Sequence, residues 1–130
     1  MPFEKSVKDV MSTNLININS EEKVAKAARL LKENKIGCLF VTFGKKTIAG
    51  IVTEPDIVRK VVAEELDQNE VSIKEVMSKP LITIDANASI TEAYYVMAVK
   101  RLRHLVVTYK EKKIGIISVR DILYAKNRGE

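Results

Sequence analysis

The sequence predicts an α+β fold built from two similar halves, each with the element order β-α-β-β-α. The first observation behind this prediction is an internal repeat, because Val10-Met11-Ser12 returns as Val76-Met77-Ser78, 66 residues later. The second is that apolar residues in both halves change from helical to strand spacing in the same order. A half of about 60 residues buries too little surface to be stable alone. We therefore expect the halves to pack on each other about a pseudo-two-fold axis.

The repeat also sets the predicted domain boundaries. Residues 1–66 form the first half, the polar residues 67–72 form a linker, and residues 73–130 form the second half. The chain has 130 residues, of which 46% are hydrophobic, and it contains only 5 glycines and 3 prolines. This composition is typical of a compact globular protein.

The first half begins with a strand and a helix. Residues 15–18 predict a short extended segment, and Ser20 is a residue type that caps helices well. Apolar residues then recur at helical spacing with charged residues between them. These residues are Val24, Ala27, Ala28 and Leu31. Gly37 is expected to mark the end of this amphipathic helix.

Two strands and a second helix complete the first half. An apolar run predicts a buried strand at 38–43, and residues 44–46 predict a hairpin turn into a strand at 47–53. A second amphipathic helix is predicted over 57–66, before the linker. Its apolar residues are Ile57, Val58, Val61, Val62 and Leu66.

The second half repeats this order. Ser89-Ile90-Thr91-Glu92 matches the capping-box pattern at a helix start. Strands are predicted at 105–109 and 113–118, and a final helix at about 119–126. The two halves thus predict the same set of elements.

The residues that usually carry catalysis are scarce. Cys38 is the single cysteine and lies in an apolar run, so we interpret it as a core residue. His104 is the single histidine and is interpreted as a strand-edge or core-lining residue rather than a base. The sequence contains neither metal-spaced clusters nor a phosphate-binding glycine loop. We therefore expect no enzymatic activity, no metal site and no obligatory cofactor.

Localisation is inferred from apolar runs and from the N-terminus. No apolar run approaches the ~20 residues of a membrane span, and the first residues lack the apolar core of a signal peptide. A single cysteine suits a reducing compartment. We expect a cytoplasmic protein.

The charge of the chain favours anionic partners. Its 22 Lys and Arg against 17 Asp and Glu give a net charge of +5. Phosphate ligands, nucleic acids and acidic membrane surfaces would all be attracted to such a protein. A mildly basic, solvated surface would have the same composition.

One motif appears twice, each time after a Gly-led apolar strand. Thr53-Glu54-Pro55-Asp56 corresponds to Ser118-Val119-Arg120-Asp121. Either copy could be a plain capping box. However, the hydroxyl and free N–H groups at a helix start also favour phosphate, and a carboxylate can accept hydrogen bonds from a ribose diol. The repeated motif therefore suggests a nucleotide.

These residues together resemble a known family. The Asp9-Val10-Met11-Ser12 opening, the β-α-β-β-α repeat and the duplicated closing motif look like a tandem pair of CBS domains, also called a Bateman module. The resemblance covers about residues 7–127. It implies two pseudo-symmetric clefts between the repeats that bind adenine nucleotides or S-adenosylmethionine. It also implies that the two repeats pack through their sheets with pseudo-two-fold symmetry, and that the protein forms a homodimer.

The resemblance implies residues for each cleft. One would combine Ser118, Arg120, Asp121, Ile116 and Arg103 with Ile16, Ile36 and Gly37. The other would combine Thr53, Asp56 and Ile51 with Ile82, Leu102 and Arg103. In these clefts Ile16 and Ile82 would hold the base, Asp56 and Asp121 the ribose, and Thr53 and Ser118 would face phosphate.

The two implied clefts are not equivalent. Arg120 lies inside its motif and can bind phosphate, whereas Pro55 occupies the matching position and supplies neither charge nor N–H. Gly37 leaves space in one cleft, and Arg103 stands at the matching place in the other. We expect the site around Asp121 to bind more tightly.

The leading hypothesis is a stand-alone regulatory module that senses AMP, ADP, ATP or S-adenosylmethionine and acts through an unidentified effector protein or through dimer geometry. One alternative is a nucleic-acid-binding protein, motivated by the net charge of +5. The other is a scaffold protein with vestigial clefts.

Overall fold

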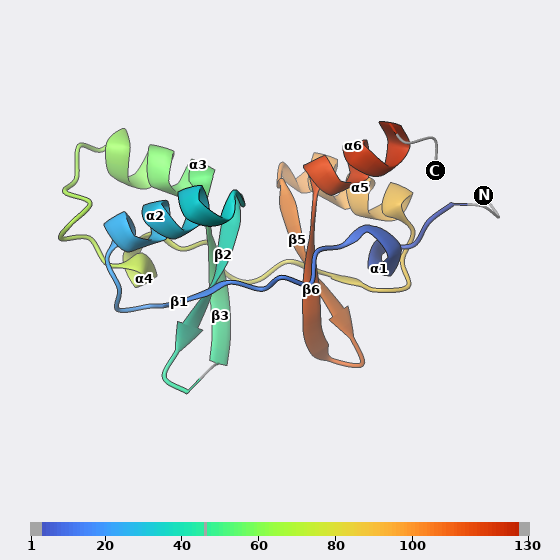
Figure 1. Cartoon of the computed structure of the whole chain (residues 1–130), viewed down its shortest axis with the longest axis horizontal. Coiled ribbons are helices and arrows are strands. Elements are labelled where there is room, and N and C mark those ends of the chain that lie inside the picture. The colour runs from blue at the N-terminus through green and yellow to red at the C-terminus, as the bar shows by residue number, and fades with distance from the viewer. Residues whose placement is uncertain (1–3, 46, 128–130) are drawn as a thin grey trace. The chain divides into compact units, whose positions relative to one another are not determined.

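The structure, a computed structural model, describes residues 4–45 and 47–127. The chain forms two compact units. One, the first-repeat unit, comprises Ile16–Leu81, and the other, the second-repeat unit, combines the segment ending at Leu15 with the chain from Ile82 onward. Each unit contains a three-stranded sheet together with helices (Figure 1). The predicted α+β class is confirmed.

The first-repeat unit has strands β1 (Asn17–Asn19), β2 (Cys38–Phe43) and β3 (Thr47–Thr53), in that spatial order. Strand β1 is parallel to β2, and β2 is antiparallel to β3. Its helical segments are α2 (Val24–Asn34), α3 (Glu54–Ile57), the π-helical turn η1 (Val58–Val62) and α4 (Ile73–Val76).

The second-repeat unit has the same topology. Its strands β4 (Thr83–Asp85), β5 (His104–Tyr109) and β6 (Lys112–Ser118) pair in the same order and directions. Its helices are α1 (Val7–Val10), α5 (Ile90–Lys100) and α6 (Val119–Asn127). The register also repeats, since Val41 lies opposite Gly50 and Val107 lies opposite Gly115.

The opening segments of the two repeats are exchanged between the units. Helix α1, at the start of the first repeat, lies in the second-repeat unit, where Val7 is fully buried and its N–H donates to the Ala88 carbonyl at 2.8 Å. Helix α4, at the start of the second repeat, lies in the first-repeat unit and buries Ile73 and Val76. Each core therefore depends on a segment from the other repeat.

One glycine in each unit allows the opening segment to pair with a strand. Ser78 and Ile51 exchange backbone hydrogen bonds of 2.7 and 3.1 Å, and Ser12 and Ile116 exchange bonds of 2.8 and 2.9 Å. A Cβ atom on Gly50 or Gly115 would lie 2.8 Å from the carbonyl oxygen of the neighbouring serine. This close approach explains why a glycine stands three residues before each closing motif.

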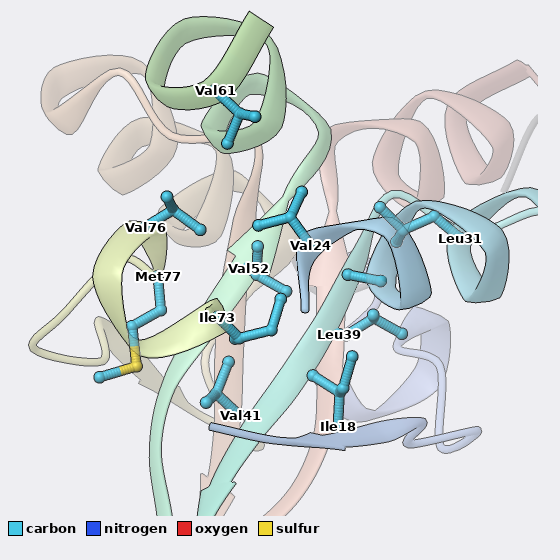
Figure 2. Close-up of a cluster of buried hydrophobic side chains, with 11 residues drawn as sticks. Ile18, Val24, Leu31, Leu39, Val41, Val52, Val61, Ile73, Val76 and Met77 are labelled. Carbon is cyan, nitrogen blue, oxygen red and sulfur yellow. The ribbon is translucent and has the colours of Figure 1, made fainter. Parts of the chain in front are cut away.

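The core of the first-repeat unit contains side chains from the sheet, from α2 and from the segment of α4 (Figure 2). Leu39, Val41 and Val52 come from the sheet and Leu31 from α2, while Met77 follows α4. Cys38 is buried at 8% exposure, which agrees with the interpretation that it is a core residue.

Two local predictions in the first half were wrong. Helix α2 begins at Val24 after Lys23, and Ser20 does not cap it; Ser20 is instead buried and its N–H donates to the Thr42 carbonyl at 2.9 Å. The second helix begins at Glu54 rather than Ile57, and its helical residues end at Val62. The capping role of Ser89 is confirmed, since its hydroxyl accepts from the Glu92 N–H at 3.0 Å.

Candidate functional site

The first closing motif forms the junction between β3 and α3. The Thr53 hydroxyl accepts from the Asp56 N–H at 3.2 Å. The Asp56 carboxylate in turn accepts from the Thr53 N–H at 2.9 Å and from its hydroxyl at 3.0 Å, both on Oδ2. Thr53 and Asp56 thus form a complete capping box, which satisfies N–H groups that a helix start leaves unpaired.

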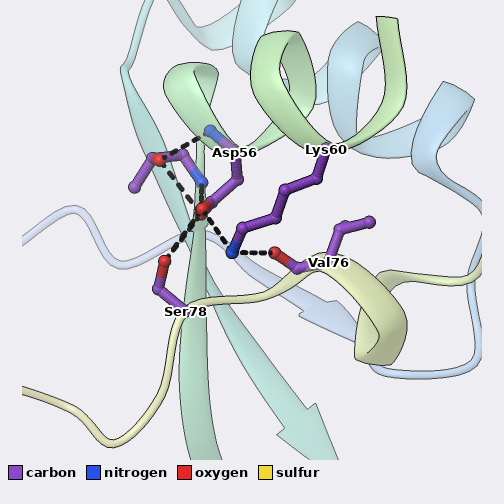
Figure 3. Close-up of polar contacts among 5 residues, drawn as sticks. Asp56, Lys60, Val76 and Ser78 are labelled. Carbon is purple, nitrogen blue, oxygen red and sulfur yellow. Dashed lines mark hydrogen bonds and ion pairs between the residues drawn. The ribbon is translucent and has the colours of Figure 1, made fainter. Parts of the chain in front are cut away.

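The Asp56 carboxylate also has two partners from outside the capping box (Figure 3). The Ser78 hydroxyl lies 2.8 Å from Oδ1 and 3.1 Å from Oδ2. The Lys60 ammonium lies 2.9 Å from Oδ1 and also donates to the Val76 carbonyl at 2.9 Å. Asp56 is only 6% exposed. Its charge is therefore buried, paired and hydrogen-bonded on both oxygens.

The second closing motif has the same backbone geometry with fewer partners. The Ser118 N–H donates to Asp121 Oδ2 at 2.8 Å, and the Asp121 N–H donates to the Ser118 hydroxyl at 3.1 Å. In the described part of the chain, Asp121 Oδ1 accepts no hydrogen bond. Ser12, which matches Ser78, instead accepts from the Asn14 N–H at 3.3 Å. Asp121 is only partly buried, so its Oδ1 atom can accept a hydrogen bond from a further donor.

His104 lies beside the second motif. It begins β5 and stands opposite Ser118 in the antiparallel register. Burial lowers the pKa of its imidazole, the negative charge of Asp121 opposes this shift, and the Arg103 charge adds to it. The His104 ring is therefore close enough to Asp121 for the two groups to interact electrostatically.

Each unit contains some of the residues assigned to each predicted cleft. The first-repeat unit holds Thr53, Asp56, Ile51, Ile16, Ile36 and Gly37, and the second-repeat unit holds Ser118, Arg120, Asp121, Ile116, Arg103, Ile82 and Leu102. The combination of residues from both units into one cleft stays a prediction. Within each unit, a backbone hydrogen bond joins the closing motif to the residue before the middle strand. The Glu54 N–H donates to the Gly37 carbonyl at 3.2 Å, and the Val119 N–H donates to the Arg103 carbonyl at 3.0 Å.

Other predicted residues occupy matched places in the two units. The Ile16 carbonyl accepts from the Phe40 N–H and the Ile82 carbonyl from the Val106 N–H, both at 3.0 Å. Ile16 and Ile36 are partly buried against the first-repeat core, as Ile82 and Leu102 are against the second. These side chains keep apolar surface available, which a purine base would need.

The sequence analysis missed Lys60 and Ser78. Lys60 stands four residues after Asp56, the spacing at which opposite charges meet on a helix, so this signal was present in the sequence. Ser78 lies 22 residues from Asp56, and only the exchange of opening segments brings them together.

Metal binding and membrane insertion find no support in the described residues. Among them, no group of three or more His, Cys, Asp and Glu side chains could hold a metal ion. No helix formed by these residues is long and apolar enough to cross a membrane.

Comparison with known families identifies the class of this chain. The CBS-domain pattern matches residues 7–63 and residues 73–128. The chain therefore belongs to the CBS-domain family, with two CBS domains in tandem. This agrees with the resemblance found in the sequence.

Individual relatives are similar over most of this chain. An uncharacterised protein of Methanopyrus kandleri, MK0525, is 34% identical over 119 residues, which are 91% of this chain and 61% of that protein. Hypoxic response protein 1 of Mycobacterium tuberculosis is 30% identical over 117 residues, 90% of this chain and 82% of its own length. This chain thus spans less than two thirds of the length of the Methanopyrus relative.

Solved structures share the fold. A protein with CBS domains from Burkholderia ambifaria has a TM-score of 0.91 at 29% identity, covering 97% of this chain and 96% of its own. A hexameric CBS-CP12 protein from bloom-forming cyanobacteria has a TM-score of 0.86 at 33% identity, covering 95% of this chain and 68% of its own.

Proposed function

We propose that this chain is a regulatory module without catalytic activity that binds an adenosine-containing ligand, either AMP, ADP, ATP or S-adenosylmethionine. The observation that carries this proposal is the second closing motif. There, Ser118 and Asp121 stand at the start of α6, and Asp121 Oδ1 has no hydrogen-bond donor among the described residues. A ribose hydroxyl is a suitable donor for that oxygen.

The charge around this motif suits a ligand that carries phosphate. Arg103 and Arg120 are both exposed; Arg103 directly precedes β5, and Arg120 lies in the first turn of α6. The N-terminus of α6 adds the partial positive charge of the helix dipole. Arginine can bind phosphate through two parallel hydrogen bonds. Ribose and phosphate would therefore find matching groups within one unit.

Calorimetric titration with AMP, ATP and S-adenosylmethionine tests this proposal. We expect saturable binding of at least one of them to the wild type and at least a tenfold loss in Asp121→Asn. Asp9→Asn is a matched control, because Asp9 closes a capping box with Ser6 at the start of a different helix, α1, in the same unit. It should bind like the wild type. No binding by ligand-free wild-type protein would overturn the proposal.

A nucleic-acid partner remains the alternative on charge grounds. DNA or RNA binding by phosphate contacts would weaken steeply as salt is added. Under the adenosyl proposal, the same nucleic acid would not be displaced specifically by AMP or ATP, and Asp121→Asn would not reduce its binding. A nucleic acid that binds tightly to wild-type protein that binds none of AMP, ATP and S-adenosylmethionine would support the alternative.

Self-association offers a route for the signal. Helix α5 exposes three large side chains, Tyr94, Tyr95 and Val99, at 51%, 67% and 62%. We infer that a second copy of this chain covers this surface in a homodimer. Light scattering tests this inference: the wild type should have twice the chain mass, and Tyr95→Glu with Val99→Glu should have the mass of one chain. A wild type that runs as a monomer at high concentration would exclude this role for α5.

A further inference from the structure

Both oxygens of the Asp56 carboxylate are already occupied by donors from the protein. Oδ1 accepts from Lys60 and Ser78, and Oδ2 accepts from Thr53 and more weakly from Ser78. A carboxylate has about four lone-pair sites for hydrogen bonds. A ribose diol would therefore have to displace protein donors before it could bind to Asp56.

Lys60 is held in this position by its ion pair with Asp56 and by a hydrogen bond to the backbone. Its ammonium group bridges Asp56 and the Val76 carbonyl, at 2.9 Å from each. The Asp56 side chain is 7% exposed, so loss of its partners would leave a buried charge unpaired. Such a loss is strongly unfavourable. The bridge also connects η1 to the end of α4, within one unit (Figure 3).

The backbone around Lys60 has a conformation that the second repeat does not share. Lys60 lies in the π-helical turn Val58–Val62, where the Ala63 N–H donates to the Val58 carbonyl at 2.8 Å. Turns of this type are rare and occur often at functional sites. The matching segment of the second repeat belongs to the α-helix α6. The backbone thus differs between the repeats at the place where Lys60 reaches back to Asp56.

The second repeat also lacks the occupying charge. Asp56 and Asp121 are 65 positions apart, so Lys60 matches residue 125, which is alanine. Ser12 takes the place of Ser78 but makes no hydrogen bond to Asp121 in the described part of the chain. The two closing motifs share their capping geometry and differ in the donors that reach the carboxylate from elsewhere.

We propose that Lys60, supported by Ser78, acts as a built-in occupant of Asp56 and closes the first motif to ligand. The chain then binds one adenosyl ligand, at Asp121, although its sequence contains two copies of the motif. This inference rests on the proposed function and adds its stoichiometry and the residue that determines it. Lys60 is the specificity-determining residue, because it is the donor whose identity differs between the repeats.

The test is the number of ligands bound per chain, measured by calorimetry and by native mass spectrometry with AMP, ATP and S-adenosylmethionine. The wild type should bind one. Lys60→Ala, which introduces the residue found at position 125, should bind a second ligand. Its affinity at Asp56 should exceed any residual affinity of the wild type at that site at least tenfold. Asp56→Asn added to this variant should remove the second site alone.

A control and a second variant keep the test decisive. Lys26→Ala removes an ion pair of the same spacing, with Glu22, in the same unit and should leave one ligand bound. Lys60→Ala with Ser78→Ala removes both extra donors and should show the second site most clearly. Thermal unfolding should confirm that each variant is folded.

The outcomes separate this inference from the proposed function. A wild type that binds one ligand while both folded Lys60 variants also bind one would overturn the role of Lys60, and the proposed function would stand. A wild type that already binds two ligands, one of which is lost in Asp56→Asn, would also overturn the role of Lys60 and leave the proposed function standing. A wild type that binds none would overturn the proposed function itself.

Discussion

The surroundings of Asp56 and Asp121 differ although the two residues occupy matched positions of a repeat. Both close a capping motif after a strand that contains a glycine packed closely against a serine carbonyl. Asp56 is buried among Thr53, Ser78 and Lys60, whereas Asp121 keeps one oxygen without a donor in the described residues. The two copies of the motif therefore differ in the donors that surround their carboxylates. Under our proposal, these donors determine which copy can accept a ligand.

The largest expected difference between the repeats is in the cost of removing each carboxylate. Asp56→Ala removes a buried acceptor from several donors, so we expect it to lower the free energy of unfolding by about 2–3 kcal/mol. Asp121→Ala removes mainly a capping interaction and should cost about 1 kcal/mol. Urea unfolding of both variants measures the difference. Equal costs would show that the extra partners of Asp56 contribute little.

The glycines test whether the repeats share their backbone packing. Gly50→Ala and Gly115→Ala each place a Cβ atom 2.8 Å from a serine carbonyl oxygen. Each substitution should lower the free energy of unfolding by about 2 kcal/mol, since either strand or opening segment must shift. Chemical denaturation should give similar values for the two. A large cost at one glycine alone would mean that the opening segments pack differently.

The serines of the opening segments give a smaller contrast. Ser78→Ala removes hydrogen bonds to a charged, buried acceptor and should cost about 1–2 kcal/mol. Ser12→Ala removes a weak contact with the Asn14 N–H and should change stability by less than about 0.5 kcal/mol. Thermal unfolding of the pair checks this. A Ser12 cost as large as that of Ser78 would contradict the contrast between the two carboxylates.

The smallest effect concerns pH and occurs only in the second repeat, where His104 lies. Burial lowers the pKa of His104 below its ordinary value of 6.5 in the folded state. The unfolded state therefore takes up this proton first as pH falls, so stability is full above 6.5 and decreases as pH falls through 6.5 towards the folded-state pKa. His104→Gln should remove this component of the pH dependence.

Asp121 sharpens that prediction, because its negative charge raises the pKa of His104 and partly offsets burial. Asp121→Asn should therefore lower the pKa of His104 further, and NMR titration of the single imidazole measures it directly. An unchanged pKa would show that the two side chains do not interact.

The repeat, the strands and the capping motifs were predictable because they depend on local patterns. The strand predicted at 38–43 matches β2, and the hydroxyl of Ser89 caps α5 as expected. The predicted cap at Ser20 was wrong because its backbone N–H pairs with Thr42, a contact made only by the folded sheet. Local sequence favoured a helix start there, and tertiary hydrogen bonding determined the outcome.

The sequence analysis also predicted a difference between the two motifs, in ligand affinity and on other grounds. The sequence analysis favoured Asp121 because Arg120 stands where the first repeat has Pro55. The structure adds the occupancy of Asp56 by Lys60 and Ser78. The contact with Ser78 could not be predicted from the sequence, because it depends on the exchange of opening segments between the repeats. Which motif binds ligand stays a prediction.

A crystal structure of the protein grown with AMP, ATP or S-adenosylmethionine would test the central claim most directly. The account predicts one ligand per chain, with a ribose hydroxyl within hydrogen-bond distance of Asp121 Oδ1 and with Lys60 still bound to Asp56. A ligand whose ribose is bound to Asp56, with Lys60 displaced and Asp121 unoccupied, would contradict it.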